Sequence, residues 1–595
     1  GFIRAMTNKP QNNSTPSQRG QITRRQVLQT SAAGAAAAGI GAVAANSTAS
    51  AAPLGSSKPA DKPINMKMGK EAFQHGIASG DPYPDSVLLW TRVTSNQNDY
   101  PGLGKGETTT VKWEVAADSK FTQIVTSGTA KAEPSRDMTV KVEARGLKPY
   151  TGYFYRFTTT DGSRKGQTSP VGKTRTAPAK GADVSELRFA LFSCSNWEAG
   201  YFSAYRDMAK RGDIDYALHV GDYIYEYPRG EYTGKTGSVR LHEPANEIKS
   251  LADYRQRYAL HHTDPDLQAA HAVCPWIVTW DDHEVANDNW AHGAENHQPD
   301  KEGNFHERRD NAWQAYLEWL PIRATPLSEK GHIYRNLSFG NLVELNMLDL
   351  RTYRNEKPGF TSARKTDDKS RTMLGSEQFG WLTKKLSTSS ARWNLIGNSV
   401  MFSPVLIPPL DPEATKAVTQ LLGLPEEGMP YNFDQWDGYA AERRRVIKYL
   451  MDNKIRNTVW LTGDIHSSWA NDIPAVPGTY PNGGTAGVEI VCTSVTSSNI
   501  DDILKLPEDN ALSHTVEYAF TNLNRHVKYL DFDSHGYTVV RVTKDAVDAN
   551  WMALAPDGKL KPNQPLHFAK AARAKWGEGI HTSTVRIDPA KHSAR

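Results

Sequence analysis

Side chains that can bind a metal or a phosphate follow six short apolar runs of this chain, where predicted strands end. They are Cys194 after LRFALF, Asp222 after YALHV, Asp281, Asp282, His283 and Glu284 after PWIVTW, Asp349 and Arg351 after LVELNML, Asn398 after RWNLI, and Asp464 and His466 after NTVWLT. In open α/β folds, binding sites form at the carboxyl ends of the strands. Carboxylates gathered there repel one another unless a metal ion supplies the opposite charge. The sequence therefore predicts a metal site at this edge of a sheet.

The spacing within two of these segments supports the same prediction. In HVGDYIYEY, Tyr225 stands three residues beyond Asp222, so both side chains can turn towards one ion. Asp464 and His466 are two residues apart, and on an extended segment their side chains point to the same face. These two side chains can therefore serve neighbouring ions.

Several of these residues also have a structural explanation. A single Asp after a strand is most often a turn or cap residue, and Asp349 is interpreted in that way. Asn398 stays open as a loop cap. Arg351 stays open between a phosphate-binding role and a structural ion pair. The repetition of metal-ligand types favours a site, because unrelated caps would not all be of these types.

The pattern of apolar residues divides the chain into regions. Residues 71–178 alternate apolar and polar positions between turn residues, which predicts a small antiparallel β-sandwich. Beyond it, compact apolar strands alternate with helical stretches such as EAGYFSAYRDMAKRG and AAERRRVIKYLMDN, which predicts an α/β domain at 186–552. Residues 553–595 are predicted to be a C-terminal tail, with a short helix over AKAARAKW.

The N-terminal segment predicts a targeting signal. Residues 1–51 hold five basic residues and no acidic residue, and the pair Arg24–Arg25 precedes a weakly apolar, Ala-rich stretch. That stretch is shorter than the roughly 18 residues that span a bilayer, and Ala49-Ser50-Ala51 offers a small-residue cleavage site. Together these features indicate a bacterial Tat signal, with residues 52–70 as a linker. The alternative is a disordered Ala-rich tail, and it stays open whether the residues ahead of Met6 belong to the natural start.

The charge of the chain is concentrated in that segment. Without its five basic residues, the net charge of +4 becomes −1. A nearly neutral chain argues against nucleic-acid or anionic-membrane binding, and no other segment is long and apolar enough to cross a membrane. We expect an exported protein, secreted or held in the periplasm or cell wall, with the Tat export machinery as a partner.

The three cysteines do not suggest a disulfide framework, because their number is odd and their spacings are long. Cys274 and Cys492 lie within apolar runs and are predicted to be small buried residues. Cys194 stands at a strand end, which makes it the one candidate ligand among them.

The segments GDYIYEY, WDDHE and TGDIHSSW stand in the order typical of the calcineurin-like metallophosphoesterases, whose pattern is GD, GNHE and GHxH. The chain departs from that pattern at three places. Ser-Cys-Ser stands where the wider family has DxH, Asp282 replaces the Asn of GNHE, and Asp464 replaces the first His of GHxH. In these departures the chain resembles the PhoD-type alkaline phosphatases, and the resemblance covers nearly all of residues 70–552, including GIASGDPYPDSVLLWTRV.

The resemblance implies a metallophosphoesterase four-layer α/β/β/α sandwich preceded by a small all-β domain of fibronectin or immunoglobulin type. It also implies a ferric ion with calcium ions, and manganese or zinc stays an alternative. Thiolate and phenolate are anionic donors that suit Fe3+, and oxygen donors suit Ca2+. The ligands implied are Cys194, Tyr225 and His466 for iron, Asp222 as a bridge, and Asp282, Asp464 and Asn287 for calcium.

The resemblance further implies hydrolysis of phosphomonoesters and phosphodiesters by attack of a metal-bound hydroxide or oxide. His283 is the candidate for protonating the leaving group, and Arg351 for holding a phosphate oxygen. Two alternatives stay open. One is a phospholipase D of the same family that acts on phospholipid diesters with the same site, and the other is a noncatalytic secreted protein that binds metal or phosphate.

Overall fold

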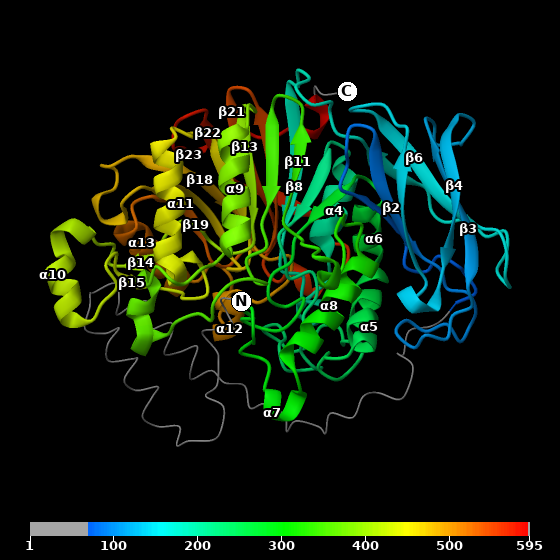
Figure 1. Cartoon of the computed structure of the whole chain (residues 1–595), viewed down its shortest axis with the longest axis horizontal. Helices are drawn as coiled ribbons and strands as arrows, with labels where there is room; N and C mark the ends of the chain where they lie inside the picture. Colours follow the sequence, from blue (N-terminus) through cyan, green and yellow to red (C-terminus); the bar gives the residue numbers. More distant parts are fainter. Residues whose placement is uncertain (1–68, 593–595) are drawn as a thin grey trace.

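The computed structural model describes residues 69–592, so the predicted signal segment and nearly all of the predicted linker lie outside the described residues. Two large β-sheets, of ten and seven strands, form the centre of the described chain (Figure 1). Their inner faces share one hydrophobic core, and helices pack on both outer faces. The predicted α/β class with the four-layer order α/β/β/α is confirmed.

The centre of the ten-stranded sheet is parallel. It consists of β8 (Glu186–Phe192), β9 (Tyr216–His219) and β10 (Trp276–Val278). The sheet continues through β20 (Gly536–Thr543), β21 (Ala546–Leu554), β22 (Leu566–Lys575) and β23 (Ile580–Ser583) beyond β8, and through β1 (Ile77–Gly80), β2 (Ser86–Arg92) and β5 (Thr139–Arg145) beyond β10.

The seven-stranded sheet also has a parallel centre. Its strands in spatial order are β11 (Arg335–Phe339), β12 (Val343–Met347), β13 (Trp393–Asn398), β16 (Thr458–Thr462), β18 (Thr485–Val491), β17 (Ser468–Pro474) and β19 (Val527–Asp531). The four strands from β12 to β18 pair in parallel, so their carboxyl ends lie at one edge.

The continuous apolar runs follow from burial on both faces of each central strand. In β8, Leu187, Phe189 and Leu191 pack into the core between the two sheets. The alternate residues Ala190 and Phe192 pack against the helices outside. A strand covered on both faces has no polar side, which is why the sequence shows no alternation there.

Helices cover the two outer faces. Those on the ten-stranded sheet are α4 (Ser203–Arg211), α5 (Leu251–His262), α6 (Pro265–His271) and α8 (Phe305–Trp319), and those on the seven-stranded sheet are α9 (Ser376–Thr388) and α11 (Ala440–Asp452). The two helical stretches that the sequence predicts are confirmed as α4 and α11. In α11, Val446, Ile447 and Leu450 form the buried stripe, as the helical period requires.

Four further helices and a small strand pair also belong to the described chain. They are α7 (Pro299–Glu302), α10 (Pro412–Leu422), α12 (Ile500–Leu504) and α13 (Ala511–Leu523), with the small pair β14 (Leu406–Ile407) and β15 (Met429–Pro430). Between residues 69 and 592, none of the helices combines the length and the apolar character that crossing a bilayer requires.

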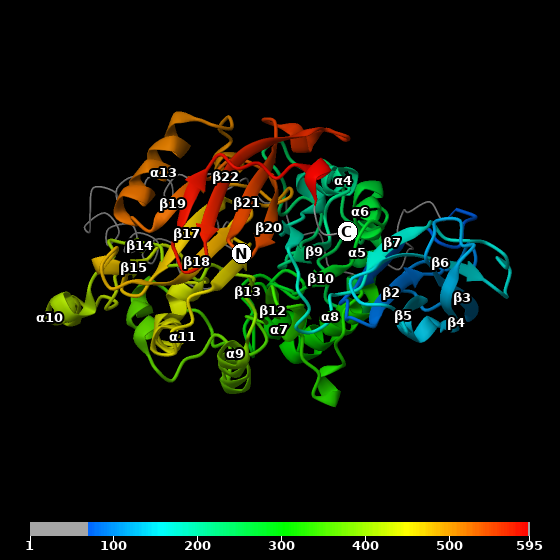
Figure 2. The same ribbon diagram turned by 90° about the horizontal axis from the view of Figure 1, so that it is seen from above.

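The N-terminal strands form a sandwich that shares a sheet with the rest of the molecule. A four-stranded sheet consists of β3 (Thr109–Ala116), β4 (Ile124–Ala132), β6 (Gly152–Thr159) and β7 (Gly172–Arg175). It packs on β2 and β5 through a core that contains Val87, Trp113 and Tyr155. Since β1 pairs with β10, the second sheet of this sandwich is the end of the ten-stranded sheet. Figures 1 and 2 place these strands, in blue, at one end of the molecule and α10 at the other.

The C-terminal region differs from the prediction. The stretch AKAARAKW lies in β22 rather than in a helix, and β22 with β23 adds two strands to the ten-stranded sheet. Ala572 and Ala574 are buried in the core between the sheets. Alanine is a strong helix former, but helix propensity amounts to less than about 1 kcal/mol per residue, and pairing with the whole length of β21 outweighs it here.

Candidate metal centre

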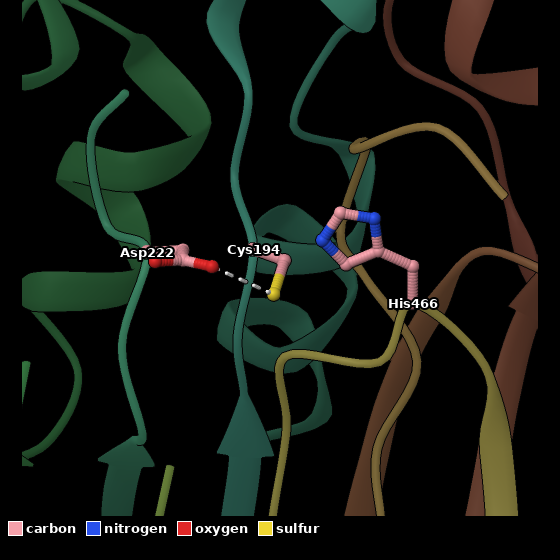
Figure 3. A group of neighbouring side chains, drawn as sticks. All are labelled: Cys194, Asp222 and His466. Carbon is pink, nitrogen blue, oxygen red and sulfur yellow. Dashed lines mark hydrogen bonds between the residues drawn. The ribbon is translucent and has the colours of Figure 1, made fainter. Parts of the chain in front are cut away.

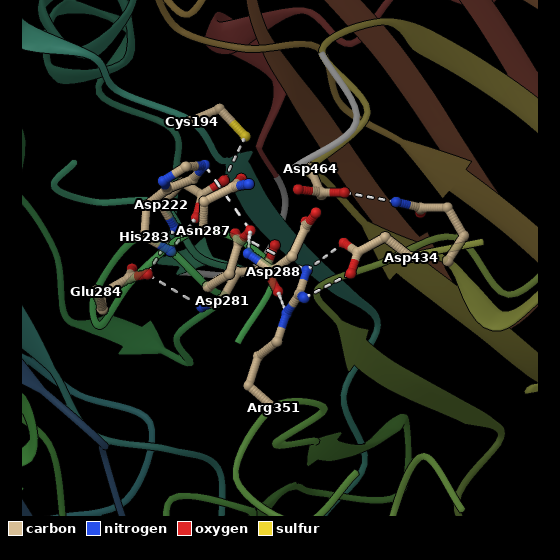
Figure 4. Close-up of polar contacts among 12 residues, drawn as sticks. Cys194, Asp222, Asp281, His283, Glu284, Asn287, Asp288, Arg351, Asp434 and Asp464 are labelled. Atoms are coloured by element: carbon tan, nitrogen blue, oxygen red, sulfur yellow. Dashed lines mark hydrogen bonds and ion pairs between the residues drawn. The ribbon is translucent and has the colours of Figure 1, made fainter. Parts of the chain in front are cut away.

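The carboxyl ends of the parallel strands in both sheets lead into one buried cluster of polar side chains (Figure 4). Cys194 follows β8, Asp222 follows β9 and Asp282 follows β10, while Asp464 and His466 follow β16 of the other sheet. None of the five is more than 2 % exposed. The structure thus brings together residues that are up to 272 positions apart in the chain.

The backbone at four of these positions is left-handed. The residues are Cys194 (φ 62°), Asp222 (φ 57°), Asp464 (φ 64°) and His466 (φ 54°). For a residue with a Cβ this conformation costs about 1–2 kcal/mol, and such strain tends to gather at functional sites. Two main-chain bonds join the first two loops, since Cys194 N donates to Gly221 O (3.1 Å) and Ser195 N donates to Asp222 O (2.9 Å).

The first group of possible ligands combines different donor types. Cys194, Asp222 and His466 each place one ligand atom within 4.8 Å of the others (Figure 3). The Cys194 thiol donates to Asp222 Oδ2 at 3.6 Å. The phenol oxygen of Tyr225 lies 3.5 Å from His466 Nε2, so it faces the same group. Sulfur, phenol, carboxylate and imidazole donors therefore meet at one point.

The second group consists of carboxylates alone. Asp222, Asp281, Asp282 and Asp464 place an oxygen each within 4.8 Å of one another, and Asp222 belongs to both groups. Burial and the neighbouring Asp282 and Asp281 raise the pKa of Asp222 well above its usual value. Asp281 Oδ2 is buried and has no hydrogen-bond partner among residues 69–592. An all-oxygen group of this kind fits a hard cation such as Ca2+.

The pKa values of the first group also fit a bound cation. Burial raises the pKa of the Cys194 thiol and of the Tyr225 phenol well above their usual values, and nearby Asp222 adds to both shifts. Burial lowers the pKa of His466, which keeps the imidazole neutral and able to bind a metal. Thiol and phenol become ligands only when they lose their protons, and a cation favours that loss.

His283 lies beside the carboxylates and is held by Glu226. Its Nδ1 donates to Glu226 Oε1 at 2.6 Å, while its Nε2 lies 3.8 Å from Asp282 Oδ2. Burial alone would raise the pKa of Glu226, but the interaction with His283 outweighs it and the pKa is lowered. Glu226 also accepts from Asn287 N at 2.8 Å. Glu226 was not among the candidate residues of the sequence analysis, because no local pattern shows that it meets His283.

Arg351 is enclosed by carboxylates. Its Nε donates to Asp281 at 2.6 Å, and its two terminal nitrogens donate to Asp434 at 2.9 and 2.7 Å. The side chain is fully buried. The two alternatives for Arg351 were a phosphate-binding role and a structural ion pair. This geometry favours the structural ion pair.

The two asparagines differ in their contacts. Asn287 donates through Nδ2 to Glu295 at 2.7 Å, which fixes the orientation of its amide. Asn398 accepts from Trp436 Nε1 through its oxygen (3.0 Å) and donates to Thr462 Oγ1 (3.0 Å). Both ends of the Asn398 amide are thus engaged by the protein, as expected for a loop residue.

Some residues of this cluster had no role in the sequence prediction. Asp288 and Asp434 form a further possible ligand group with Asp282. Gln435 Nε2 donates to Asp464 Oδ2 at 2.5 Å. Asp288 stands in the DDHEVANDN segment, so its carboxylate type and position were a usable signal. Asp434 and Gln435 follow no strand, and no pattern in the sequence marks them.

The chain is similar to known proteins over most of its length. The family model described as PhoD-like phosphatase matches residues 189–551, and the model of its N-terminal domain matches residues 57–178. Alkaline phosphatase D of Bacillus subtilis (strain 168) is 39% identical over 489 residues, which are 81% of this chain and 77% of that protein. A solved structure of PhoD is 35% identical with a TM-score of 0.74, covering 88% of this chain and 97% of that one. Purple acid phosphatase PPD1 from yellow lupin seeds is more distant, with 11% identity and a TM-score of 0.47 over 84% of this chain and 73% of that one.

Proposed function

Because this chain belongs to the PhoD-like phosphatase family and is a phosphoester hydrolase, we propose that it is an exported enzyme that releases phosphate from phosphomonoesters and phosphodiesters at a centre of one ferric ion and calcium ions. The observation that supports this most is that Asp222 belongs both to the group with Cys194 and His466 and to the group of four carboxylates. A carboxylate shared in this way could serve two neighbouring ions.

The ligand assignment follows the donor types. Cys194, Tyr225 and His466 would hold the ferric ion, since thiolate and phenolate are anionic donors. The calcium ligands would be Asp282 and Asp464 with Asn287, and Asp222 would be shared by both kinds of ion. Bound there, the ions would lower the pKa of a water molecule and offset the charge of the phosphate.

Residues of the chain itself would transfer a proton and orient the histidine and carboxylate side chains of the site. His283 would protonate the leaving oxygen through Nε2, the nitrogen that faces the carboxylates. Glu226 fixes the ring by accepting from Nδ1. Arg351 would hold Asp281 and Asp434 in place, since its guanidinium donates to both. This division of roles needs no covalent intermediate on the protein.

The test combines metal content with substrate choice. Iron and calcium are measured in the purified protein, and hydrolysis of p-nitrophenyl phosphate, bis(p-nitrophenyl) phosphate and phosphatidylcholine is compared with and without a chelator. We expect bound iron and calcium, and activity on the first two substrates that the chelator removes. A protein without bound ions and without chelator sensitivity would contradict the proposal. A strong preference for phosphatidylcholine would revise the substrate class to phospholipids.

Export is tested separately through the arginine pair. Replacing Arg24 and Arg25 by lysine is expected to keep the enzyme inside a producing bacterium, because Tat export depends on that pair. The activity of the extracellular or periplasmic fraction is compared with that of the cytoplasm. Unchanged export of the double variant would contradict the Tat route and leave the hydrolase proposal intact.

A further inference from the structure

The loop that joins β18 to α12, residues 492–499, contacts each residue proposed for the ferric ion. Its sequence, CTSVTSSN, consists mostly of small hydroxyl residues and contains no carboxylate or imidazole. For that reason the sequence pattern did not mark this loop as part of a metal site. The side chains of Thr496 and Ser497 are fully buried.

Ser497 is the centre of these contacts. Its hydroxyl donates to the Tyr225 phenol oxygen at 2.6 Å and lies 2.9 Å from the carbonyl oxygen of Cys194. The next residue, Ser498, accepts from His466 Nδ1 through its carbonyl oxygen at 2.9 Å. Since a carbonyl only accepts, Nδ1 carries the hydrogen of the neutral ring, which leaves Nε2 as the nitrogen that can bind a metal.

A hydroxyl has one hydrogen, and Ser497 has two oxygen partners for it. The Cys194 carbonyl does not depend on that hydrogen, because the backbone N–H groups of Thr496 and Ser497 also donate to it, at 3.4 and 3.3 Å. The Tyr225 oxygen has no such substitute within this loop. The hydrogen of Ser497 is therefore available for the phenol oxygen while the Cys194 main chain stays held.

The loop is itself firmly attached. Thr496 Oγ1 donates to Asn196 O at 2.7 Å, and Lys559 Nζ donates to Thr496 O at 2.9 Å. Ser494 Oγ donates to Ser497 O at 2.6 Å. A donor fixed in this way holds its partner in one position, which a mobile side chain cannot do.

We propose that Ser497 is the positioning residue of the Cys194–Tyr225–His466 group, and that its hydroxyl fixes the Tyr225 oxygen at the distance from the other two side chains that one shared ion needs. The inference rests on the proposed function, because it assumes that these three residues bind an ion. Ser497 does not touch the substrate. Its effect passes through Tyr225, as outer hydrogen bonds orient the ligands of other metal sites.

The test compares the full-length Ser497→Ala variant with the wild-type enzyme. We expect the affinity for iron to fall by about 10- to 100-fold, the range typical of lost outer hydrogen bonds. The phenolate-to-iron absorption band is expected to move to longer wavelength, because loss of the donor raises the energy of the phenolate lone pair. Ser497→Thr keeps the hydroxyl and is expected to restore both properties.

Ser403→Ala serves as the matched control. Ser403 is also buried and donates to a carbonyl, that of Asp472, at 2.9 Å, but it contacts none of the three residues. Equal iron affinity and an unmoved band in Ser497→Ala would overturn the inference while the proposed function stands. A wild-type enzyme that holds another ion would contradict the proposed iron, and the same variants then test Ser497 through the affinity for that ion. A wild-type enzyme without any ion would overturn both.

Discussion

Two buried polar clusters lie on either side of the loop that follows β9. Asp222 points into the carboxylate cluster, while the next residue, Tyr223, points into a cluster of histidines behind it. These are His75, His219, His261, His262 and His271, and the phenol oxygen of Tyr223 lies 2.9 Å from His271 Nε2. Each of these histidines is at most 1 % exposed.

Burial shifts the pKa values of the two clusters in opposite directions. It raises the pKa of Asp222 and Asp281, whereas it lowers the pKa of His219 and His262 to about 3. In both cases the charged form is the one that burial disfavours. Asp222 and Asp281 need a cation to stay ionised, while the histidines avoid charge and pack as neutral rings, with the ring centroids of His271 and Trp276 stacked 3.9 Å apart. The same penalty thus favours a bound cation on one side and a neutral aromatic core on the other.

The largest effect is expected from removing Asp222, the carboxylate that belongs both to the group with Cys194 and His466 and to the group of four carboxylates. Asp222→Asn is expected to lower kcat/KM by roughly 10²- to 10³-fold or more, the range for loss of one group that stabilises charge in a transition state. Metal analysis and steady-state kinetics check this. Asp349→Asn is the control, because Asp349 is also a buried Asp at a strand end but belongs to none of the ligand groups. Full activity and metal content in Asp222→Asn would refute the shared-ligand role.

Removal of the ions from the carboxylate cluster is expected to lower the free energy of unfolding. An ion present at 100 to 1,000 times its dissociation constant stabilises the fold by about 2.7–4.1 kcal/mol, so a chelator should lower Tm by several degrees. Differential scanning calorimetry measures the shift. Added calcium and iron should reverse it, and a Tm that does not respond to chelator would contradict a metal-dependent cluster.

Glu226→Gln tests His283, a histidine that lies beside the carboxylates. Without the ionised partner, His283 loses its fixed orientation, and we expect kcat to fall by roughly 10- to 100-fold. The loss should be larger for an alkyl phosphate than for p-nitrophenyl phosphate, whose leaving group needs no proton. Equal losses for both substrates would argue against proton donation by His283.

The histidine cluster is expected to make the protein labile to acid. Its pKa values lie below the ordinary value of 6.5, so the unfolded chain binds protons below that pH while the folded chain does not. The contribution of these histidines to the free energy of unfolding therefore has its full value above pH 6.5 and is lost progressively as the pH drops towards 3. Each histidine contributes up to about 1.4 kcal/mol per pH unit to this fall.

Urea unfolding at several pH values from 8 to 5 measures this dependence. His262→Gln removes one of the five histidines, and it is expected to reduce the slope between pH 6 and 5 by up to about 1.4 kcal/mol per pH unit. His567→Gln, at a site that is exposed and lies outside the cluster, should leave the slope unchanged. If His262→Gln leaves the pH dependence of the free energy of unfolding unchanged, the buried neutral histidines do not cause the expected acid lability.

The sequence predicts those residues of the site that a pattern of neighbouring residues marks. Cys194, Asp222 and Asp282 each follow a continuous apolar run, and those runs are strands because both faces of β8, β9 and β10 are covered. The contacts of Glu226 with His283, and of Ser497 with Tyr225, join segments that are 57 and 272 residues apart. Such a contact cannot be predicted from the spacing of residues within one segment.

The sequence by itself determined the central strands, the types of side chain at their ends and the order of the motifs, because each of these is a property of neighbouring residues. Only the tertiary structure decided which side chains meet: Asp434 and Gln435 reach the carboxylates from a loop, Arg351 is enclosed by Asp281 and Asp434, and β22 pairs with β21 instead of forming a helix. The physical reason is the same in each case. Burial and strand pairing between distant segments contribute more free energy than the conformational preferences of neighbouring residues. Tyr223 is the simplest case, because it is next to Asp222 in the chain but lies in the histidine cluster rather than the carboxylate cluster.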